Sequence, residues 1–187
     1  MASLDPLGDR HGVSGHWSGH YQYDSPLQEG RTCPVAATLW EVRGRIEGVM
    51  SDGLTQSAYS LRKVLDNADA MGKISAVVFQ AMLRRHPGTT VETSLPTDSV
   101  LRGRLRGDTL RFTKTYEGAY TTRFLDAGWT LASVVSHRHR VHYSGVFDVA
   151  RGVIEGTWGI RHPGPLGRFL PRRGTGTFFL ARDDNSG

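Results

Sequence analysis

The sequence HRVHYSGVFDVARGVIEGTWGI, from His139 to Ile160, alternates apolar and polar residues on both sides of a turn at 150–152. A period of two is typical of a strand that buries one face. The stretch therefore predicts a β-hairpin whose two arms face the same core. The apolar set of the two arms is Val141, Tyr143, Phe147, Ile154, Trp158 and Ile160.

Each arm of this hairpin also has a central glycine, Gly145 and Gly156, and similar glycines occur in GHWSGHY, GRIEGVM and VLRGRLRG. A glycine inside a strand marks a sharp bend or the close approach of another backbone. Repeated bends of this kind are what a sheet needs in order to close on itself. The pattern therefore predicts a β-barrel.

Composition agrees with an all-β domain. The 187 residues suit one domain, and 23 glycines against eight prolines favour many short strands and turns. The net charge is +5, but no run of five or more Lys/Arg residues marks a nucleic-acid-binding tail. A single cysteine, Cys33, excludes an internal disulfide framework. With neither an apolar run of membrane-spanning length nor an apolar signal-peptide core, we expect a cytoplasmic protein without nucleic-acid partners.

The expected order of elements is a lead-in, three strands, a helical insertion, five strands and a short tail. Residues 1–14 form the flexible lead-in, 15–182 a single barrel domain, and 183–187 the tail. The helical insertion covers about 57–86, with a break near Gly72, because its apolar residues recur at three- and four-residue spacing. Residues 117–138 remain unassigned between a short helix, a loop and an extra strand. The eight strands expected are 15–23, 34–42, 45–52, 100–106, 109–116, the two hairpin arms and 175–182.

Gly15-His16-Trp17 opens the first strand, and Arg182 ends the last. This pattern resembles the calycin superfamily, which includes lipocalins, fatty-acid-binding proteins and avidins. The resemblance implies an eight-stranded antiparallel up-and-down barrel, with Trp17 at its closed end and Arg182 lying across the indole. A guanidinium on an indole face is independently favourable, since it adds a cation–π contact to the burial of the ring. The helical insertion departs from the pattern of fatty-acid-binding proteins, where a helical lid follows the first strand.

Lys114 is a charged residue on an otherwise apolar strand face, between Phe112 and Tyr116. Inside a barrel it could hold an anionic or carbonyl group, and burial would lower its pKa. At the rim its ammonium would instead reach water. If it lies inside, Lys114→Met is expected to keep the fold at least as stable. The expected ligand-binding residues are Tyr21, Tyr23, Phe112, Lys114, Tyr116, Tyr143 and Trp158, with Lys114 and Tyr116 as candidate catalytic residues.

Three functions fit these patterns. The first is the binding of a mostly apolar small molecule in the barrel cavity, with the helical insertion as a lid. The second is a cofactor-independent cyclase or isomerase that uses the same cavity. The third and weaker one is an interaction module with a basic outer face, formed by Arg102, Arg104, Arg106 and Arg111 or by the basic loop 161–173.

Histidines cluster at His137, His139 and His142, but neither Cys nor carboxylate lies nearby to complete a tetrahedral site. On a strand, moreover, His142 would face away from the other two. We therefore expect neither a metal nor a cofactor.

Overall fold

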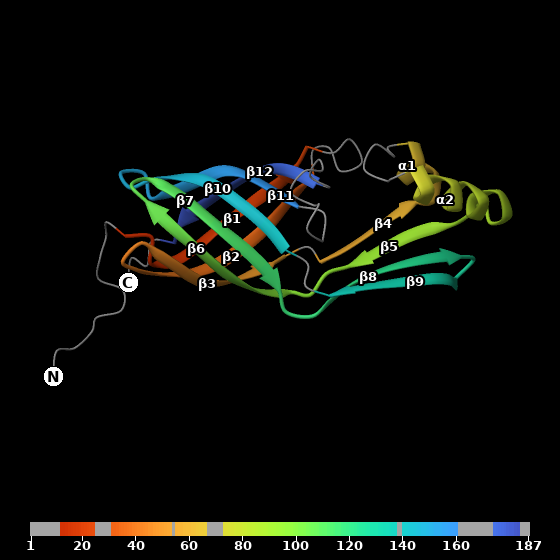
Figure 1. Cartoon of the computed structure of the whole chain (residues 1–187), viewed down its shortest axis with the longest axis horizontal. Helices are drawn as coiled ribbons and strands as arrows, with labels where there is room; N and C mark the ends of the chain where they lie inside the picture. Colours follow the sequence, from red (N-terminus) through yellow and green to blue (C-terminus); the bar gives the residue numbers. More distant parts are fainter. Residues whose placement is uncertain are drawn as a thin grey trace.

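The computed structural model describes residues 12–24, 31–53, 55–66, 73–137, 140–160 and 174–183. Eight antiparallel strands form a closed barrel in the order β1-β12-β11-β10-β7-β6-β3-β2 (Figure 1). All eight strands expected from the sequence are present in it. Their bounds are β1 (Gly15–Tyr23), β2 (Thr32–Val42), β3 (Arg45–Asp52), β6 (Asp98–Arg106), β7 (Thr109–Tyr116), β10 (Arg140–Asp148), β11 (Val153–Ile160) and β12 (Gly174–Arg182).

The central hairpin pairs β10 with β11, and the apolar residues of both arms face the same core, as the alternation predicted. Tyr143 lies opposite Trp158, and Gly145 lies opposite Gly156. A Cβ on Gly156 would overlap the carbonyl oxygen of Ser144, so this position requires glycine. The glycine pair therefore allows the two strands to approach closely where the barrel wall bends.

A second sheet, which we call the extension sheet, was not predicted. It consists of β4 (Gln56–Ser60), β5 (Thr90–Ser94), β8 (Ala119–Asp126) and β9 (Trp129–His137), in the order β4-β5-β8-β9. The unassigned residues 117–138 thus contain a hairpin, and the start of the expected helical insertion is a strand. The hairpin turns at Ala127 and Gly128, whose φ angles are 47° and 85°. Alanine in place of the usual Asn or Asp hides this turn from sequence analysis.

Each strand of the extension sheet continues a strand of the barrel. The barrel neighbours β3-β6-β7-β10 correspond in order to β4-β5-β8-β9. The hydrogen-bond ladder crosses the junction, because Asp52 N–H donates to Thr97 O at 3.1 Å and Leu95 N–H donates to Thr55 O at 2.7 Å. One half of the barrel wall is therefore prolonged beyond the barrel, as Figure 1 shows.

Two helices, α1 (Leu61–Asp66) and α2 (Lys73–Arg85), confirm the helical insertion, while its expected break near Gly72 lies outside the described residues. They lie at the far end of the extension sheet, away from the barrel (Figure 1). Leu61, Val91 and Phe124 form a core of their own there, and the ring of Phe79 stacks on that of Phe124 at 5.0 Å. In this arrangement the helices cover the extension sheet and do not form the expected lid over the barrel. None of the described helices is long and apolar enough to cross a membrane.

The barrel core is closed at one end by Trp17 and Arg182, which are direct neighbours in the β1–β12 register. The guanidinium carbon of Arg182 lies 5.1 Å from the centre of the indole, and Arg182 Nη2 also donates to Gly12 O. Trp17 is fully buried, and its Nε1 donates to Val13 O at 2.9 Å. The closed antiparallel barrel and this end contact, which we call the plug, are consistent with a calycin-like architecture.

We expect Arg182→Ala to lower the free energy of unfolding by about 1–2 kcal/mol, because the cation–π contact and the packing of the aliphatic stem are lost together. Urea denaturation followed by tryptophan fluorescence measures the change. Arg123→Ala is the matched control, since Arg123 forms only a half-exposed ion pair with Glu92 on the extension sheet. Equal midpoints for wild type and Arg182→Ala would show that the plug does not stabilise the barrel.

Candidate functional site

A buried polar cluster lies inside the barrel toward the end that leads to the extension sheet. The turns at 43–44, 107–108 and 149–152 lie at the plug end, so β3 and β7 both finish at the opposite end. Asp52 is the last residue of β3, and Lys114 and Tyr116 lie near the end of β7. Strict alternation along both strands turns all three side chains inward. Lys114 is 0% exposed and Asp52 3%, so the expected alternative of a rim lysine does not apply.

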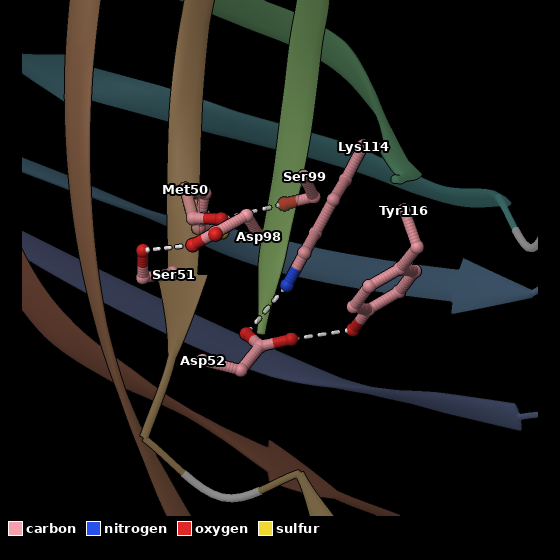
Figure 2. A network of polar contacts seen from close by, with 7 residues as sticks. All are labelled: Met50, Ser51, Asp52, Asp98, Ser99, Lys114 and Tyr116. Carbon is pink, nitrogen blue, oxygen red and sulfur yellow. Dashed lines mark hydrogen bonds and ion pairs between the residues drawn. The ribbon is translucent and has the colours of Figure 1, made fainter. Parts of the chain in front are cut away.

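The three side chains are joined through the Asp52 carboxylate, as Figure 2 shows. Lys114 Nζ lies 2.5 Å from Asp52 Oδ1, and Tyr116 OH donates to Asp52 Oδ2 at 2.6 Å. The ammonium also lies 4.5 Å from the centre of the Tyr116 ring. Each carboxylate oxygen therefore has its own donor, which is the arrangement that a buried carboxylate needs.

Two further hydrogen bonds fix the strands beside this cluster. Ser99 Oγ donates to Met50 O at 2.7 Å, and Ser51 Oγ donates to Asp98 Oδ1 at 3.0 Å (Figure 2). Both link β3 to β6, which lies between β3 and β7 in the barrel. They hold the backbone from which Asp52 projects and so limit its freedom relative to β7.

Burial shifts the proton equilibria of this cluster. Desolvation lowers the pKa of Lys114, and the neighbouring Asp52 opposes that shift. Desolvation raises the pKa of the Tyr116 phenol, and the Asp52 carboxylate raises it further. Tyr116 therefore remains a protonated hydrogen-bond donor throughout the neutral range.

The other expected ligand-binding residues form two groups in the same interior. Tyr21, Tyr23 and Trp158 are in edge-to-face contact, with the Tyr23 and Trp158 ring centres 4.8 Å apart. The Tyr21 ring centre also lies 6.0 Å from Lys114 Nζ. Phe112 and Tyr143 are stacked at 4.6 Å, one inward position along β7 toward the plug from Lys114. The structure therefore brings Tyr21 and Tyr116 to Lys114, while Phe112 and Tyr143 form the aromatic layer beneath.

Asp52 is the residue that sequence reasoning missed. Asp52 is the last residue of the third expected strand, and the Asp52-Gly53 pair is typical of a turn, so no direction is expected for its side chain. The signal was nevertheless present, because Asp52 has the same parity as Ile46 and Met50, which are both buried. Extending the alternation by one residue would have placed a carboxylate inside the barrel.

Spectroscopic titration should show that most tyrosines of the native protein resist ionisation at pH 11. Burial raises the pKa of Tyr23 to about 12 and also raises the pKa values of Tyr21, Tyr116 and Tyr143 well above the ordinary value of a tyrosine. These are four of the six tyrosines. Because their folded-state pKa exceeds the unfolded value, the stability that they contribute is complete below about pH 10 and is lost as the pH rises through the folded-state values.

Tyrosinate absorbance measured at pH 11 in buffer and in denaturant provides the comparison. We expect full ionisation at that pH only after denaturation. Equal absorbance in the native and the denatured protein would contradict the burial of these phenols.

The candidate metal ligands do not form a site within the described residues. His142 faces outward, where its Nδ1 lies 3.1 Å from Thr113 Oγ1. His139 lies outside the described residues, as does the basic loop 161–173. In the described part of the chain, no group of three or more His, Cys, Asp or Glu residues could hold a metal ion.

Neither a protein-family model nor a curated protein matches the sequence. The function of the buried cluster is therefore inferred from its geometry.

Proposed function

We propose that this protein is a calycin-like barrel that binds a small, mostly apolar molecule at the end of the barrel that leads to the extension sheet. In this proposal Asp52, Lys114 and Tyr116 hold the polar group of the ligand, and Tyr21, Tyr23 and Trp158 contact its apolar part. The free, buried thiol of Cys33 suits the reducing conditions of the cytoplasm, which we propose as its location.

The observation that carries the proposal is the fully buried Lys114–Asp52 ion pair in an otherwise apolar barrel. Removing two charges from water requires several kcal/mol for each ion, and apolar residues of similar volume often give equal or greater stability. Stability alone would therefore favour apolar residues in place of Asp52, Lys114 and Tyr116. A polar ligand group that uses the cluster would account for its presence.

The donors of the cluster indicate the class of ligand. An ammonium has three N–H donors, and the hydrogen bond to Asp52 uses one of them. A carboxylate or carbonyl oxygen is the natural acceptor for the others. The aromatic rings of Tyr21, Tyr23 and Trp158 favour an apolar body attached to that group. The proposed ligand is thus an amphipathic small molecule with one acidic or carbonyl head.

The test starts with native mass spectrometry of the purified protein, which detects a co-purified ligand. A fluorescence titration with dansylaminoundecanoic acid, an apolar chain with one carboxylate, then measures binding directly. Tyr116→Phe removes only the hydroxyl that donates to Asp52, and we expect it to weaken binding tenfold or more. The matched control is Tyr120→Phe, the same change on the extension sheet. Absence of binding by the wild type, or equal affinities for all three proteins, would overturn the proposal.

A second candidate is a cofactor-independent isomerase or cyclase, and one observation favours it. The Tyr116 hydroxyl holds the Asp52 carboxylate, and Lys114 Nζ has two N–H donors besides the one that Asp52 accepts, so the ammonium can donate to an oxyanion that develops in a transition state. Such an enzyme would convert a compound into a product of equal mass and different retention time. Incubation with fractionated metabolites, followed by liquid chromatography and mass spectrometry, separates it from a binding protein. Loss of conversion in Tyr116→Phe, but not in Tyr120→Phe, would support it.

A further inference from the structure

A hollow of about 1000 Å³ lies on the outer face of the barrel, over β6, β7, β10 and β11. Its volume is at the upper end of the range for small-molecule sites. Arginines, hydroxyl side chains and a histidine line most of it, and none of the lining residues is acidic. The polar lining residues are Arg102, Arg104, Arg106, Thr109, Arg111, Thr113, His142, Ser144 and Thr157.

The four arginines come together through the strand register. Arg104 lies directly opposite Arg111, and Arg45 of β3 lies on the other side of Arg104. Like charges in directly opposed positions destabilise a sheet. The barrel therefore maintains an unfavourable arrangement on this face, and an anion would relieve it.

Acidic residues of the described chain do not neutralise these arginines. In the register of the described strands, Arg102 lies opposite an acidic residue, Glu47, whereas Arg104, Arg106 and Arg111 do not lie opposite one. Yet none of the described ion pairs involves Arg102, Arg104, Arg106 or Arg111, and these side chains extend into the hollow. Their guanidinium groups are thus available to a ligand.

Hydroxyl groups continue the donor surface across the neighbouring strands. Ser144 lies opposite Arg111, and Thr157 lies opposite Ser144, so the row runs from β6 to β11. Adjacent strands are about 4.8 Å apart, which places Arg104, Arg111 and Ser144 within about 10 Å of one another. Guanidinium forks bind phosphate oxygens in pairs, and hydroxyls complete the hydrogen bonds.

We propose that this hollow, which we call the arginine hollow, binds a small oligophosphate anion, that is, a molecule with two or more linked phosphate groups. Four arginines in a site of this size match several negative charges better than one. A nucleic-acid strand is less suitable, because the two aromatic residues of the lining, Phe112 and Tyr143, are only 3% and 5% exposed and offer no stacking surface. The inference is independent of the interior site.

Isothermal titration calorimetry with sodium tripolyphosphate at physiological salt tests the proposal. We expect binding that weakens as salt is added, because the charges are exposed. Arg104→Gln and Arg111→Gln should each weaken it tenfold or more, and the double variant should abolish it. Arg85→Gln at the end of α2 removes the same charge elsewhere and should leave the affinity unchanged. Tyr116→Phe should also leave it unchanged, since that side chain faces the interior.

Two further titrations identify the source of the phosphates. Equal affinity for ATP and tripolyphosphate would assign recognition to the phosphates alone, and tighter ATP binding would assign a nucleotide; both results support the arginine hollow. Three results would overturn it: absence of tripolyphosphate binding, equal losses in Arg104→Gln and Arg85→Gln, or tighter binding of a single-stranded RNA oligonucleotide than of tripolyphosphate.

Discussion

Asp52→Ala should lower the free energy of unfolding by about 3–5 kcal/mol, because it leaves the Lys114 ammonium buried without its carboxylate. The change also removes the acceptor of the Tyr116 hydroxyl. The ammonium and the hydroxyl are then both buried without a partner, and each costs the full free energy of its removal from water. Urea denaturation at neutral pH, followed by circular dichroism, measures the loss.

Two controls separate this effect from simple loss of packing. The triple variant Asp52→Leu, Lys114→Met and Tyr116→Phe removes both charges and the hydroxyl that Asp52 accepts from, and we expect its stability to return to within about 1 kcal/mol of the wild type. Asp126→Ala removes a carboxylate from a partly exposed pair with His86 and should change stability by about 1 kcal/mol or less. A loss below about 1 kcal/mol for Asp52→Ala would mean that water reaches the cluster.

Gly176→Ala should also be strongly damaging, with a loss of about 3 kcal/mol, the upper end of the range for overpacked cores. A Cβ at this position of β12 would overlap the carbonyl oxygen of Gln22 and lie 2.6 Å from Trp158 Nε1. The backbone of β1 cannot yield without breaking its pairing with β12. The indole is also held in place, since it donates to Gln22 O and Thr177 O.

Gly174→Ala is the matched control for this change, because Gly174 has the same parity in the same strand. A Cβ there would have only ordinary contacts, the nearest at 3.6 Å from Ile160 Cδ1. We expect its stability to stay within about 0.5 kcal/mol of the wild type. Thermal melts of both variants suffice, and similar midpoints for the two would contradict the close approach of β1 to Gly176.

The barrel was predictable from the sequence because each of its strands buries one face fully. Strict alternation in residues such as Ile46, Met50, Phe112 and Tyr143 is the direct result of that burial. The extension sheet lacks this signal. In β8 only Phe124 is buried, so its sequence AYTTRFLD shows little contrast between the two faces. A sheet that buries few side chains produces little alternation of apolar and polar residues in the sequence, however long its strands are.

The interior site was only half predictable, because the alternation of each strand gives the inward direction of its side chains but not which residue of another strand they meet. Lys114 could be found from its own strand, whereas its carboxylate lies 62 residues earlier in sequence. That partner reverses the expectation for Lys114→Met. From the sequence alone the change preserves stability, but beside Asp52 it leaves a buried carboxylate without its cation and should cost several kcal/mol.

The extension sheet also bears on how quickly the barrel can assemble. β7 and β10 are barrel neighbours, although β8 and β9 separate them along the chain. Pairing that begins at the Ala127–Gly128 turn can proceed along β8–β9 into β7–β10, so that each step closes only a short loop. The junction of β1 with β12 has no such route, since Trp17 and Arg182 must meet across nearly the whole chain. Topology therefore favours early formation of the prolonged half of the wall and late closure at the plug.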